Sequence, residues 1–472
     1  MAGMQRWLRT RGLRQGDRVA LMLGNSLEHM SLIYALMLSG MVWVPVNTKL
    51  RGAGLRYVFE HARPALIVTD ARFESLASVE VSLQHRMVAV PQPDDDPTSQ
   101  ALEYCDVEDT DTLCLLYTSG TTGSPKGVQF THRMMRIAAE SALMVADVRE
   151  GDRLFMWEPL CHIGGAQLLL MPFMLPVQLH AVEQFSASRF WDQWTQARAT
   201  HLHYLGGILD ILIQRMSSDP SLAAIDRKVS VAWGAGLSKM AWPIVEERLG
   251  CRIRECYGMT ECSSFATYNT TGKPGSIGRA LPWLDIQLQS FDGKEVAPGE
   301  TGQIVLSSRL EGALFPGYFD DPAATAQALR GGKLFTGDLA RQDFDGDYTF
   351  VGRLTDSMRV RGENVSAWEV ERVFLENDAI AACAAVGISA EVGEQEILLY
   401  VQYKEGQAPT WEALVAWAEP RMAKYQMPRF YRAVTSFELT PSERIRKHTL
   451  SRDTDDAWEF VVNADRQGET TK

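Results

Sequence analysis

The sequence has little cysteine, and its few cysteines form no metal-binding or disulfide pattern. Only seven of the 472 residues are cysteine, and none is followed by another at the C-x-x-C spacing that zinc ligands and redox pairs use. An odd number of scattered thiols does not indicate a disulfide framework either. Free thiols persist in a reducing compartment, so we expect the protein to be cytoplasmic.

The chain also lacks an excess of positive charge and an unbroken apolar run of membrane-spanning length. Its formal net charge of −12 argues against general binding to nucleic acid or to an anionic membrane. Two runs are uncharged, but 30–48 is interrupted by Gly40 and Pro45, and 161–182 holds two His, two Gln and two Pro. We therefore expect both to be core elements, with no membrane span. The first residues contain no apolar signal region.

What the chain does contain is the composition of a folded globular protein. Hydrophobic residues make up 46% and charged residues 22%, and the length exceeds that of one compact core, so we expect two or more domains. Near the N-terminus the pattern predicts a strand at 18–23, a helix at 26–39 that stops at Gly40, and a strand at 42–46. This order implies parallel α/β layers.

A loop rich in glycine and hydroxyl residues is the strongest chemical signal. An apolar run at 113–116 is followed by Thr-Ser-Gly-Thr-Thr-Gly-Ser-Pro-Lys-Gly-Val at 118–128, with three Gly and five hydroxyl residues in eleven positions. Glycines let backbone N–H groups turn toward a ligand, hydroxyls add donors, and Lys126 adds a positive charge, so the stretch suits the phosphates of a nucleotide. The ordinary P-loop pattern does not fit it. A plain surface turn is the alternative.

Two further segments, later in the sequence, contain residues with chemical groups that complement this loop. A strand-like run at 229–237 ends in a Gly-Ala-Gly turn, for which a plain connection between a strand and a helix is the alternative. Tyr257-Gly-Met-Thr-Glu261 then supplies an aromatic ring, a hydroxyl and a carboxylate. Nucleotidyl transfer needs these three groups to stack on adenine, to contact the α-phosphate and to bind Mg²⁺.

Other polar clusters are expected to be structural. His201 and His203 alternate as on a strand, with no third metal ligand nearby. Asp343, Asp345 and Asp347 surround a glycine without the spacing of a calcium-binding EF-hand, and a hairpin turn explains them better.

These motifs together resemble the adenylate-forming (AMP-binding) superfamily, which includes acyl-CoA synthetases, luciferases and peptide-synthetase adenylation domains. The resemblance covers about residues 12–450. The amino-acid sequence at 359–366 is most similar to that of the crotonobetaine/carnitine-CoA ligase branch. It implies the following nucleotide-binding positions: Thr118, Ser119, Gly120, Thr121, Thr122, Gly123, Gly234, Ala235, Gly236, Tyr257, Gly258, Thr260, Asp338 and Arg353.

The resemblance also implies the remaining site residues. It assigns catalysis to Lys126, Thr260, Glu261 and Arg444, with Glu261 as the ligand of Mg²⁺. His162, in a Pro-Leu-x-His-x-x-Gly element, would line the acyl site with Gly206 and Gly207. Asp356 would be a hinge, and Arg361 and Gly362 would serve the coenzyme A step.

The implied fold is α/β, with a large multi-subdomain N-terminal domain at 1–355 and a small mobile α+β C-terminal domain at 356–472. Family members usually carry a few tens of residues ahead of this start, so the first domain is expected to be short at its N-terminus. The implied enzyme is an ATP-dependent acid–thiol ligase, which activates a carboxylic acid as acyl-AMP with MgATP and transfers the acyl group to coenzyme A. An adenylating enzyme with another acceptor and a catalytically weak nucleotide- or acyl-binding homologue remain alternatives. A homodimer is left open.

The tail departs from the family at the adenylation lysine, where this chain has Arg444 preceded by Glu443. Arginine keeps its charge at any pH, and its planar fork suits two oxyanions. We predict that Arg444→Ala slows adenylation by orders of magnitude and spares thioester formation from pre-made acyl-adenylate, measured as two separate half-reactions. The competing candidate is Lys447. If Lys447→Ala shows this phenotype and Arg444→Ala does not, the assignment of Arg444 is wrong.

Overall fold

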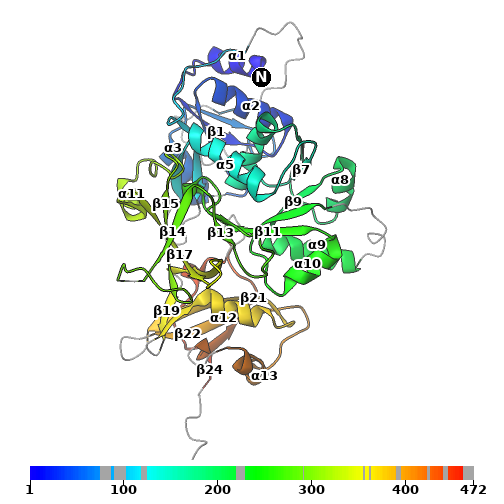
Figure 1. The fold of residues 1–472 in the computed structure, drawn as a ribbon, viewed down its shortest axis with the longest axis vertical. Coiled ribbons are helices and arrows are strands. Elements are labelled where there is room, and N and C mark those ends of the chain that lie inside the picture. The colour runs from blue at the N-terminus through cyan, green and yellow to red at the C-terminus, as the bar shows by residue number, and fades with distance from the viewer. Residues whose placement is uncertain are drawn as a thin grey trace, which may run out of the picture. The chain divides into compact units, whose positions relative to one another are not determined.

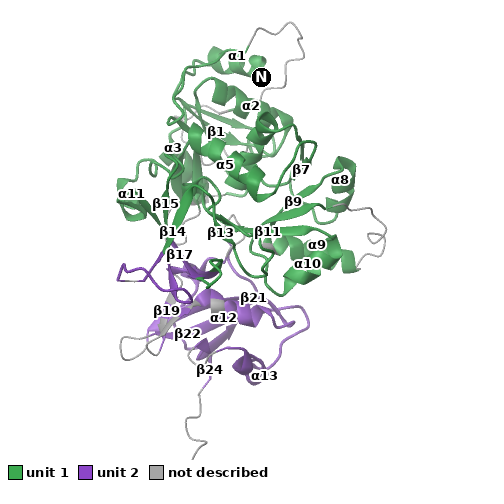
Figure 2. Ribbon diagram, viewed as in Figure 1, with its two compact units in different colours: residues 1–287, 305–336, 342–349 green, residues 288–304, 337–341, 350–472 purple. Residues whose placement is uncertain are grey.

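The computed structural model describes residues 1–50, 52–74, 87–89, 102–118, 125–218, 229–290, 292–354, 357–360, 363–389, 395–422, 426–439 and 445–460. The chain divides into two compact units (Figure 2). Unit 1 comprises 1–287, 305–336 and 342–349, and unit 2 comprises 288–304, 337–341 and 350–472. Each unit has its own sheets and hydrophobic core.

The first sheet of unit 1 is mainly parallel and has the strand order β4-β3-β1-β2-β5-β6. Its strand β1 and the helices α1, α2, α3 and α5 are labelled in Figure 1. Its strands are β1 (Arg18–Met22), β2 (Val42–Pro45), β3 (Leu66–Thr69), β4 (Met87–Ala89), β5 (Thr112–Thr118) and β6 (Lys126–Thr131). Its helices are α1 (Ala2–Thr10), α2 (Leu27–Leu38), α3 (Gly52–Ala62) and α5 (His132–Val145). β1 and β2 lie side by side in parallel register, as the strand–helix–strand spacing predicts.

The second sheet of unit 1 has the order β13-β12-β11-β10-β9-β7-β8. Its strands are β7 (Arg153–Met156), β8 (Gln178–Ala181), β9 (His201–Leu205), β10 (Val231–Ala235), β11 (Arg252–Tyr257), β12 (Thr267–Tyr268) and β13 (Arg279–Ala280). The connecting helices are α6 (Ile163–Ala166), η1 (Gln167–Leu170), α7 (Met171–Met174), α8 (Phe190–Ala197), α9 (Gly206–Ser218), α10 (Ala241–Leu249) and η3 (Thr260–Cys262). Four of the fully buried tryptophans, 191, 194, 233 and 242, lie in this part of unit 1.

A third sheet, β14-β15-β17-β16 with β18 beside β17, contributes residues to both units. Its elements are β14 (Leu284–Gln289), β15 (Thr301–Ser308), α11 (Pro322–Ala328), β16 (Leu329–Arg330), β17 (Lys333–Gln342) and β18 (Tyr348–Arg353). The aspartates at 343–347 lie in the turn between β17 and β18, where the Lys273 ammonium is 2.5 Å from Asp343 Oδ2 and 3.3 Å from Asp345 Oδ2. A lysine therefore occupies the place that a calcium ion would need, and the hairpin interpretation is correct.

Unit 2 contains a β19–β20 pair and a four-stranded sheet in the order β21-β22-β23-β24. Its elements are β19 (Ser357–Val360), β20 (Glu363–Ser366), α12 (Ala367–Leu375), β21 (Ile380–Ser389), β22 (Gln395–Tyr403), α13 (Trp411–Ala418), η5 (Glu419–Arg421), β23 (Phe430–Ala433), η7 (Lys447–Thr449) and β24 (Trp458–Glu459). α12 begins at 367, the start that the Ser366–Glu369 capping box predicts.

The predicted helix from 26 to its stop at Gly40 is confirmed, and α5 begins with a cap of the same kind. Ser26 and Thr131 lie at the N-caps of α2 and α5, and each side chain accepts a hydrogen bond from the backbone N–H three residues later. Gly40 has φ +62°, the left-handed conformation that ends a helix at little cost in glycine. The run 30–48 is therefore a helix followed by a strand. In the part of the chain that the structure describes, no helix has both the length and the apolar character to cross a membrane.

The cap at Thr131 connects the strand after the glycine-rich loop to α5, and its Oγ1 lies 3.1 Å from the Met134 nitrogen. Thr131→Ala removes this acceptor and should lower the free energy of unfolding by about 1 kcal/mol. Urea denaturation checks the value, with Thr131→Ser as the control that keeps the hydroxyl. Equal losses in the two variants would show that the methyl group, and not the cap, stabilises the helix.

Candidate active site

Four of the predicted site segments lie at one edge of the second sheet. Strands β7, β9, β10 and β11 are parallel, and each is followed at its carboxyl end by a segment singled out in the sequence. These segments are 158–165 after β7, 206–207 after β9, 234–236 at the end of β10 and 257–261 at the end of β11. Ligands bind at the carboxyl ends of parallel strands in open α/β sheets, so the fold gathers these residues where a small-molecule site is expected.

The Gly-Ala-Gly turn at the end of β10 has no room for side chains. Gly234 has φ +156°, and a Cβ on it would lie 1.9 Å from the Tyr204 carbonyl oxygen. Gly236 has φ +94°. The turn therefore requires glycine at both positions, and it is exposed at Gly236 while Gly234 is buried.

A buried carboxylate holds this turn, and sequence reasoning did not identify it. Glu255 Oε1 accepts hydrogen bonds from the backbone N–H of Gly236 at 2.5 Å and of Leu237 at 3.2 Å. The Tyr204 hydroxyl donates to Oε2 of the same carboxylate. Burial, with the Glu255 charge adding to it, raises the pKa of Tyr204 well above its usual range, so the phenol stays protonated and keeps donating. By accepting hydrogen bonds from these backbone N–H groups, Glu255 fixes the conformation of the turn.

The segment after β11 is packed backbone against backbone. Tyr257 is buried, and its carbonyl accepts a hydrogen bond from the Ala266 N–H at 2.8 Å. A Cβ on Gly258 would lie 1.8 Å from the Ser264 carbonyl oxygen, so only glycine fits. The short helix η3 follows, with Thr260 half-buried and Glu261 buried. The pentapeptide is therefore a rigid turn whose three chemical groups lie within five residues.

Lys126 and Glu261 are brought together by a residue that the sequence analysis missed, Tyr318. The Tyr318 hydroxyl donates to Glu261 Oε1 at 2.7 Å, and the Lys126 ammonium lies 5.2 Å from the centre of the same ring. The Phe319 N–H donates to the Gly127 carbonyl at 2.7 Å, which fastens the two segments. No local pattern marks Tyr318, which follows Gly317 between β15 and α11, so only the tertiary structure could identify it.

The environment of Glu261 fits the Mg²⁺ that accompanies ATP. A carboxylate oxygen is the ligand type that this cation prefers, and a nearby ammonium suits the phosphates that the cation would bridge. Burial and the Glu261 charge raise the pKa of Tyr318 above its usual range, so its hydroxyl remains a donor that orients the carboxylate.

His162 lies at the start of α6, directly after the β7 segment. The neighbouring Cys161 sulfur, helped by the Glu158 carboxylate, raises the pKa of His162 to about 9 against the effect of burial. A Cβ on Gly164 would lie 2.1 Å from Glu158 Oε2, so the glycine makes room for that side chain.

His203 faces Glu158, with Nδ1 2.9 Å from Oε2, and both side chains are buried. His201 lies nearer Asp152, at 3.8 Å. In the described ranges no three metal-ligating side chains lie together, which agrees with a structural interpretation of the two histidines. Gly206 and Gly207 begin α9 at the end of β9, and a Cβ on Gly207 would meet no atom within 4 Å.

Of the remaining predicted residues, Thr118 is the last residue of β5 in unit 1, and the others lie in unit 2 or outside the described ranges. In unit 2, Arg353 Nε is 3.3 Å from Asp338 Oδ1, on the neighbouring strands β18 and β17. Lys447, the competitor of Arg444, pairs with Glu371 at 2.7 Å. The following predicted positions lie outside the described residues: Ser119, Gly120, Thr121, Thr122, Gly123, Asp356, Arg361, Gly362 and Arg444.

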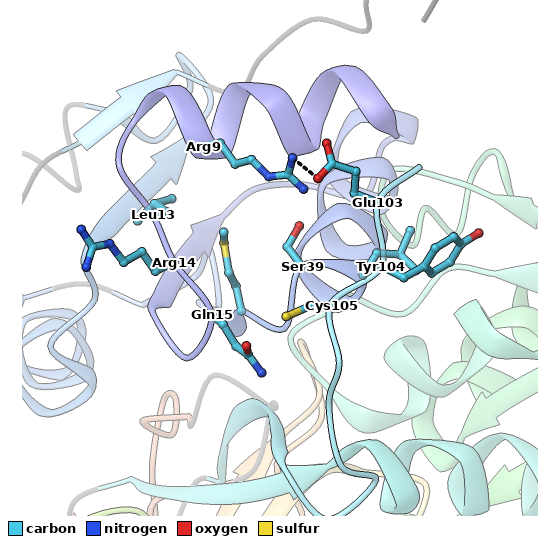
Figure 3. A pocket seen from close by; sticks show the side chains of 10 residues that line it. Arg9, Leu13, Arg14, Gln15, Ser39, Glu103, Tyr104 and Cys105 are labelled. Atoms are coloured by element: carbon cyan, nitrogen blue, oxygen red, sulfur yellow. Dashed lines mark ion pairs between the residues drawn. The ribbon is translucent and has the colours of Figure 1, made fainter. Parts of the chain in front are cut away.

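A cavity elsewhere in unit 1 contains none of these residues. It has a volume of about 360 Å³ and lies beside α1 and α2, with the Arg9–Glu103 ion pair at its rim (Figure 3). Gln5 exchanges hydrogen bonds with the backbone of Glu103, and Gln15 donates to the Asp106 carbonyl at 2.9 Å. These contacts fasten 103–106 to the N-terminal helices, so we regard the cavity as a crevice of the packing.

Comparison with known families gives two adjacent matches. The AMP-binding enzyme family matches residues 4–319, and the AMP-binding enzyme C-terminal domain matches residues 369–444. The first match alone covers more than half of the chain. It includes each of the segments gathered at the carboxyl ends of β7, β9, β10 and β11.

Similar proteins are known in sequence and in structure. Crotonobetaine/carnitine–CoA ligases of Salmonella heidelberg and Salmonella typhimurium are each 30% identical over 93% of this chain and 89% of their own length. The o-succinylbenzoate-CoA synthetase of Bacillus subtilis, solved with its acyl-adenylate intermediate, has a TM-score of 0.83 at 25% identity, over 97% of this chain and 92% of that chain. Its complex with ATP and magnesium has a TM-score of 0.82 at 25% identity, over 95% and 92%. The expected α/β fold, with a large N-terminal part and a smaller C-terminal part, is confirmed.

Tyr318 offers a test of the contact between Lys126 and Glu261. Tyr318→Phe keeps the ring beside Lys126 and removes the hydrogen bond to Glu261, so we expect a five- to twentyfold loss, corresponding to roughly 1–2 kcal/mol, in ATP-dependent pyrophosphate release, with a higher Mg²⁺ requirement. Tyr318→Leu, which also removes the ring, should lose more. A Tyr318→Phe enzyme with unchanged Mg²⁺ dependence would contradict the role of the hydroxyl.

Proposed function

Because this chain belongs to the AMP-binding enzyme family, we propose that it is an ATP-dependent acyl-CoA ligase. In the first step the carboxylate oxygen of an acid attacks the α-phosphorus of ATP, the bond to the β-phosphate oxygen breaks, and pyrophosphate leaves. In the second step the coenzyme A thiolate attacks the acyl carbon, and AMP leaves with the electrons of the broken C–O bond. The observation that carries the proposal is the placement of Lys126 and Glu261 around Tyr318, at the base of the glycine-rich loop.

The phosphate end of ATP is assigned to unit 1 residues. Lys126 would neutralise charge on the phosphates, and Thr260 would donate its hydroxyl to the α-phosphate. The bound cation would supply further charge neutralisation, with Glu261 holding it. The backbone and hydroxyl groups of 118–123 would donate to phosphate oxygens, as the sequence of that loop implies. Each of these groups acts by position and charge, which suits phosphoryl chemistry.

The adenosine end is assigned to the turn that Glu255 supports. Its backbone at 234–236 would face the base, and Tyr257 would pack against it. The contact between Asp338 and Arg353 supports a role for both at the ribose, because a carboxylate held by a guanidinium accepts hydrogen bonds from two neighbouring hydroxyls.

For the acid, we propose a site formed by His162, Gly206 and Gly207. The position of His162 after β7 supports this, because the neighbouring parallel strand β9 ends at Gly206 and Gly207. The relatives named above are ligases of crotonobetaine and carnitine, so betaine-type acids belong in any substrate panel beside short, medium-chain and aromatic acids.

The second step is assigned to the C-terminal part of the chain. We retain a division into domains at 1–355 and 356–472, with Asp356 as hinge, Arg444 serving adenylation, and Arg361 and Gly362 serving the coenzyme A step. The engagement of Lys447 by Glu371 supports Arg444 over Lys447, because an ion-paired ammonium is less free to bind the reacting oxyanions.

Two finer points complete the proposal. None of the seven cysteines forms a disulfide, which supports a cytoplasmic location. A homodimer stays an open alternative to a monomer, and light scattering on the purified protein decides between them.

The activity is tested by a screen for pyrophosphate release over acids of these classes, with and without coenzyme A. We expect release to require both ATP and an acid, and continued AMP production to require coenzyme A. Pyrophosphate release with no thioester formed from any thiol would favour an adenylating enzyme with another acceptor. ATP binding without release from any acid would favour a binding protein.

A further inference from the structure

His61, in the last turn of α3, contacts Tyr117, the residue directly before the glycine-rich loop at 118–128. Its Nδ1 lies 2.8 Å from the hydroxyl oxygen of Tyr117, the penultimate residue of β5. The imidazole also stacks on Tyr57, with ring centres 5.2 Å apart and planes inclined by 18°. The ring is thereby held in one orientation, with Nδ1 directed at the tyrosine.

Tyr117 lies against the strand that returns from the glycine-rich loop. It pairs in register with Gly127, and the next pair is Thr118 with Lys126. A Cβ on Gly127 would lie 3.3 Å from Tyr117 Cζ and 3.6 Å from its hydroxyl oxygen, so the ring packs directly on this glycine. The orientation of the Tyr117 ring therefore affects how the end of β5 packs against the start of β6, the two strands that residues 119–125 connect.

The same histidine contacts the segment that carries Tyr318. The Phe319 ring lies 5.6 Å from the His61 ring at nearly a right angle, and the Phe319 N–H donates to the Gly127 carbonyl at 2.7 Å. Asp320 follows with φ +54° and pairs with Arg63 at 2.9 Å. His61 is thus placed between both structures that position Lys126: the β5–β6 pair and the segment 317–320.

We propose that His61 is a positioning residue for nucleotide binding: by accepting the Tyr117 hydroxyl hydrogen at Nδ1, it fixes the strand ends that present Lys126 to the phosphates of ATP. This rests on the proposed function, since it concerns the same phosphate site. His61 itself does not touch the nucleotide. Its effect should therefore appear in the affinity for MgATP and not in the affinity for the acid.

The role requires a neutral imidazole, which gives it a pH signature. Burial lowers the pKa of His61, an effect opposed by Asp320 and Asp321 and reinforced by Arg63. The other titratable groups facing it are the phenols of Tyr57 and Tyr117, and burial raises the pKa of both. Because the pKa of His61 is lowered from 6.5, the acceptor is present at neutral pH and is lost as the pH falls through the lowered value.

Four variants test the contact by direct titration of MgATP into the whole protein, which needs no known acid. His61→Leu and Tyr117→Phe each remove one partner and should weaken MgATP binding about tenfold, the value of one partly buried hydrogen bond. The double variant should be no weaker than either single one, because both remove the same interaction. His61→Asn places Oδ1 near the position of Nδ1 and should restore most of the affinity.

The pH profile separates this role from a purely structural one. Between about pH 5 and 8 the wild type should lose affinity on the acid side, and His61→Asn, which cannot titrate, should lose less. The nucleotide titrates identically in both experiments, so comparing the MgATP affinities of the two proteins at each pH removes its contribution. Tyr34→Phe is the matched control, since its hydroxyl donates to the Leu169 carbonyl at 2.7 Å far along the chain from this motif, and its MgATP affinity should be unchanged.

Three outcomes decide the matter. A wild-type protein that binds no MgATP would contradict the proposed function itself. Wild-type binding with unchanged affinity in His61→Leu and Tyr117→Phe would overturn this inference alone. Lower thermal stability in these variants, with the same affinity loss in Tyr34→Phe, would assign the effect to general destabilisation and overturn it as well.

Discussion

The candidate site depends on the contact of Tyr318 with two side chains of opposite charge, Glu261 and Lys126. Its hydroxyl donates to the Glu261 carboxylate at 2.7 Å, and its ring lies 5.2 Å from the Lys126 ammonium. The phenol contacts the carboxylate by hydrogen bonding and the ammonium by its π-face, so one neutral side chain links both charged groups.

The rest of the site follows from parallel strands and from short contacts that only glycine allows. Strands β7, β9, β10 and β11 end at the same edge of one sheet, which brings segments from 158 to 261 together. At that edge Gly234 and Gly258 lie so near other backbone atoms that a Cβ would come within 1.9 Å and 1.8 Å of carbonyl oxygens. The close packing lets turns approach a ligand with backbone atoms, and Glu255 then supplies the acceptor that such a turn needs.

Polar side chains under the surface set the charges of the site. Cys161 and Glu158 raise the pKa of His162, while burial raises the pKa of Tyr204 and lowers that of His61. His61 and Tyr204 are therefore uncharged at neutral pH, whereas Glu255 holds the Gly-Ala-Gly turn with a carboxylate.

The sequence by itself determined the elements whose signals are local. Adjacent residues are enough to identify these features, because backbone conformation and capping depend on near neighbours. They are the glycine-rich loop, the Gly-Ala-Gly turn, the Tyr-Gly-Met-Thr-Glu motif and the caps at Ser26 and Thr131. Only the tertiary structure decided their partners. Tyr318 meets Glu261 across 57 residues, Glu255 meets Gly236 across 19, and His61 meets Tyr117 across 56. No periodicity predicts such pairs, since side chains from different elements come into contact only after the sheets have formed.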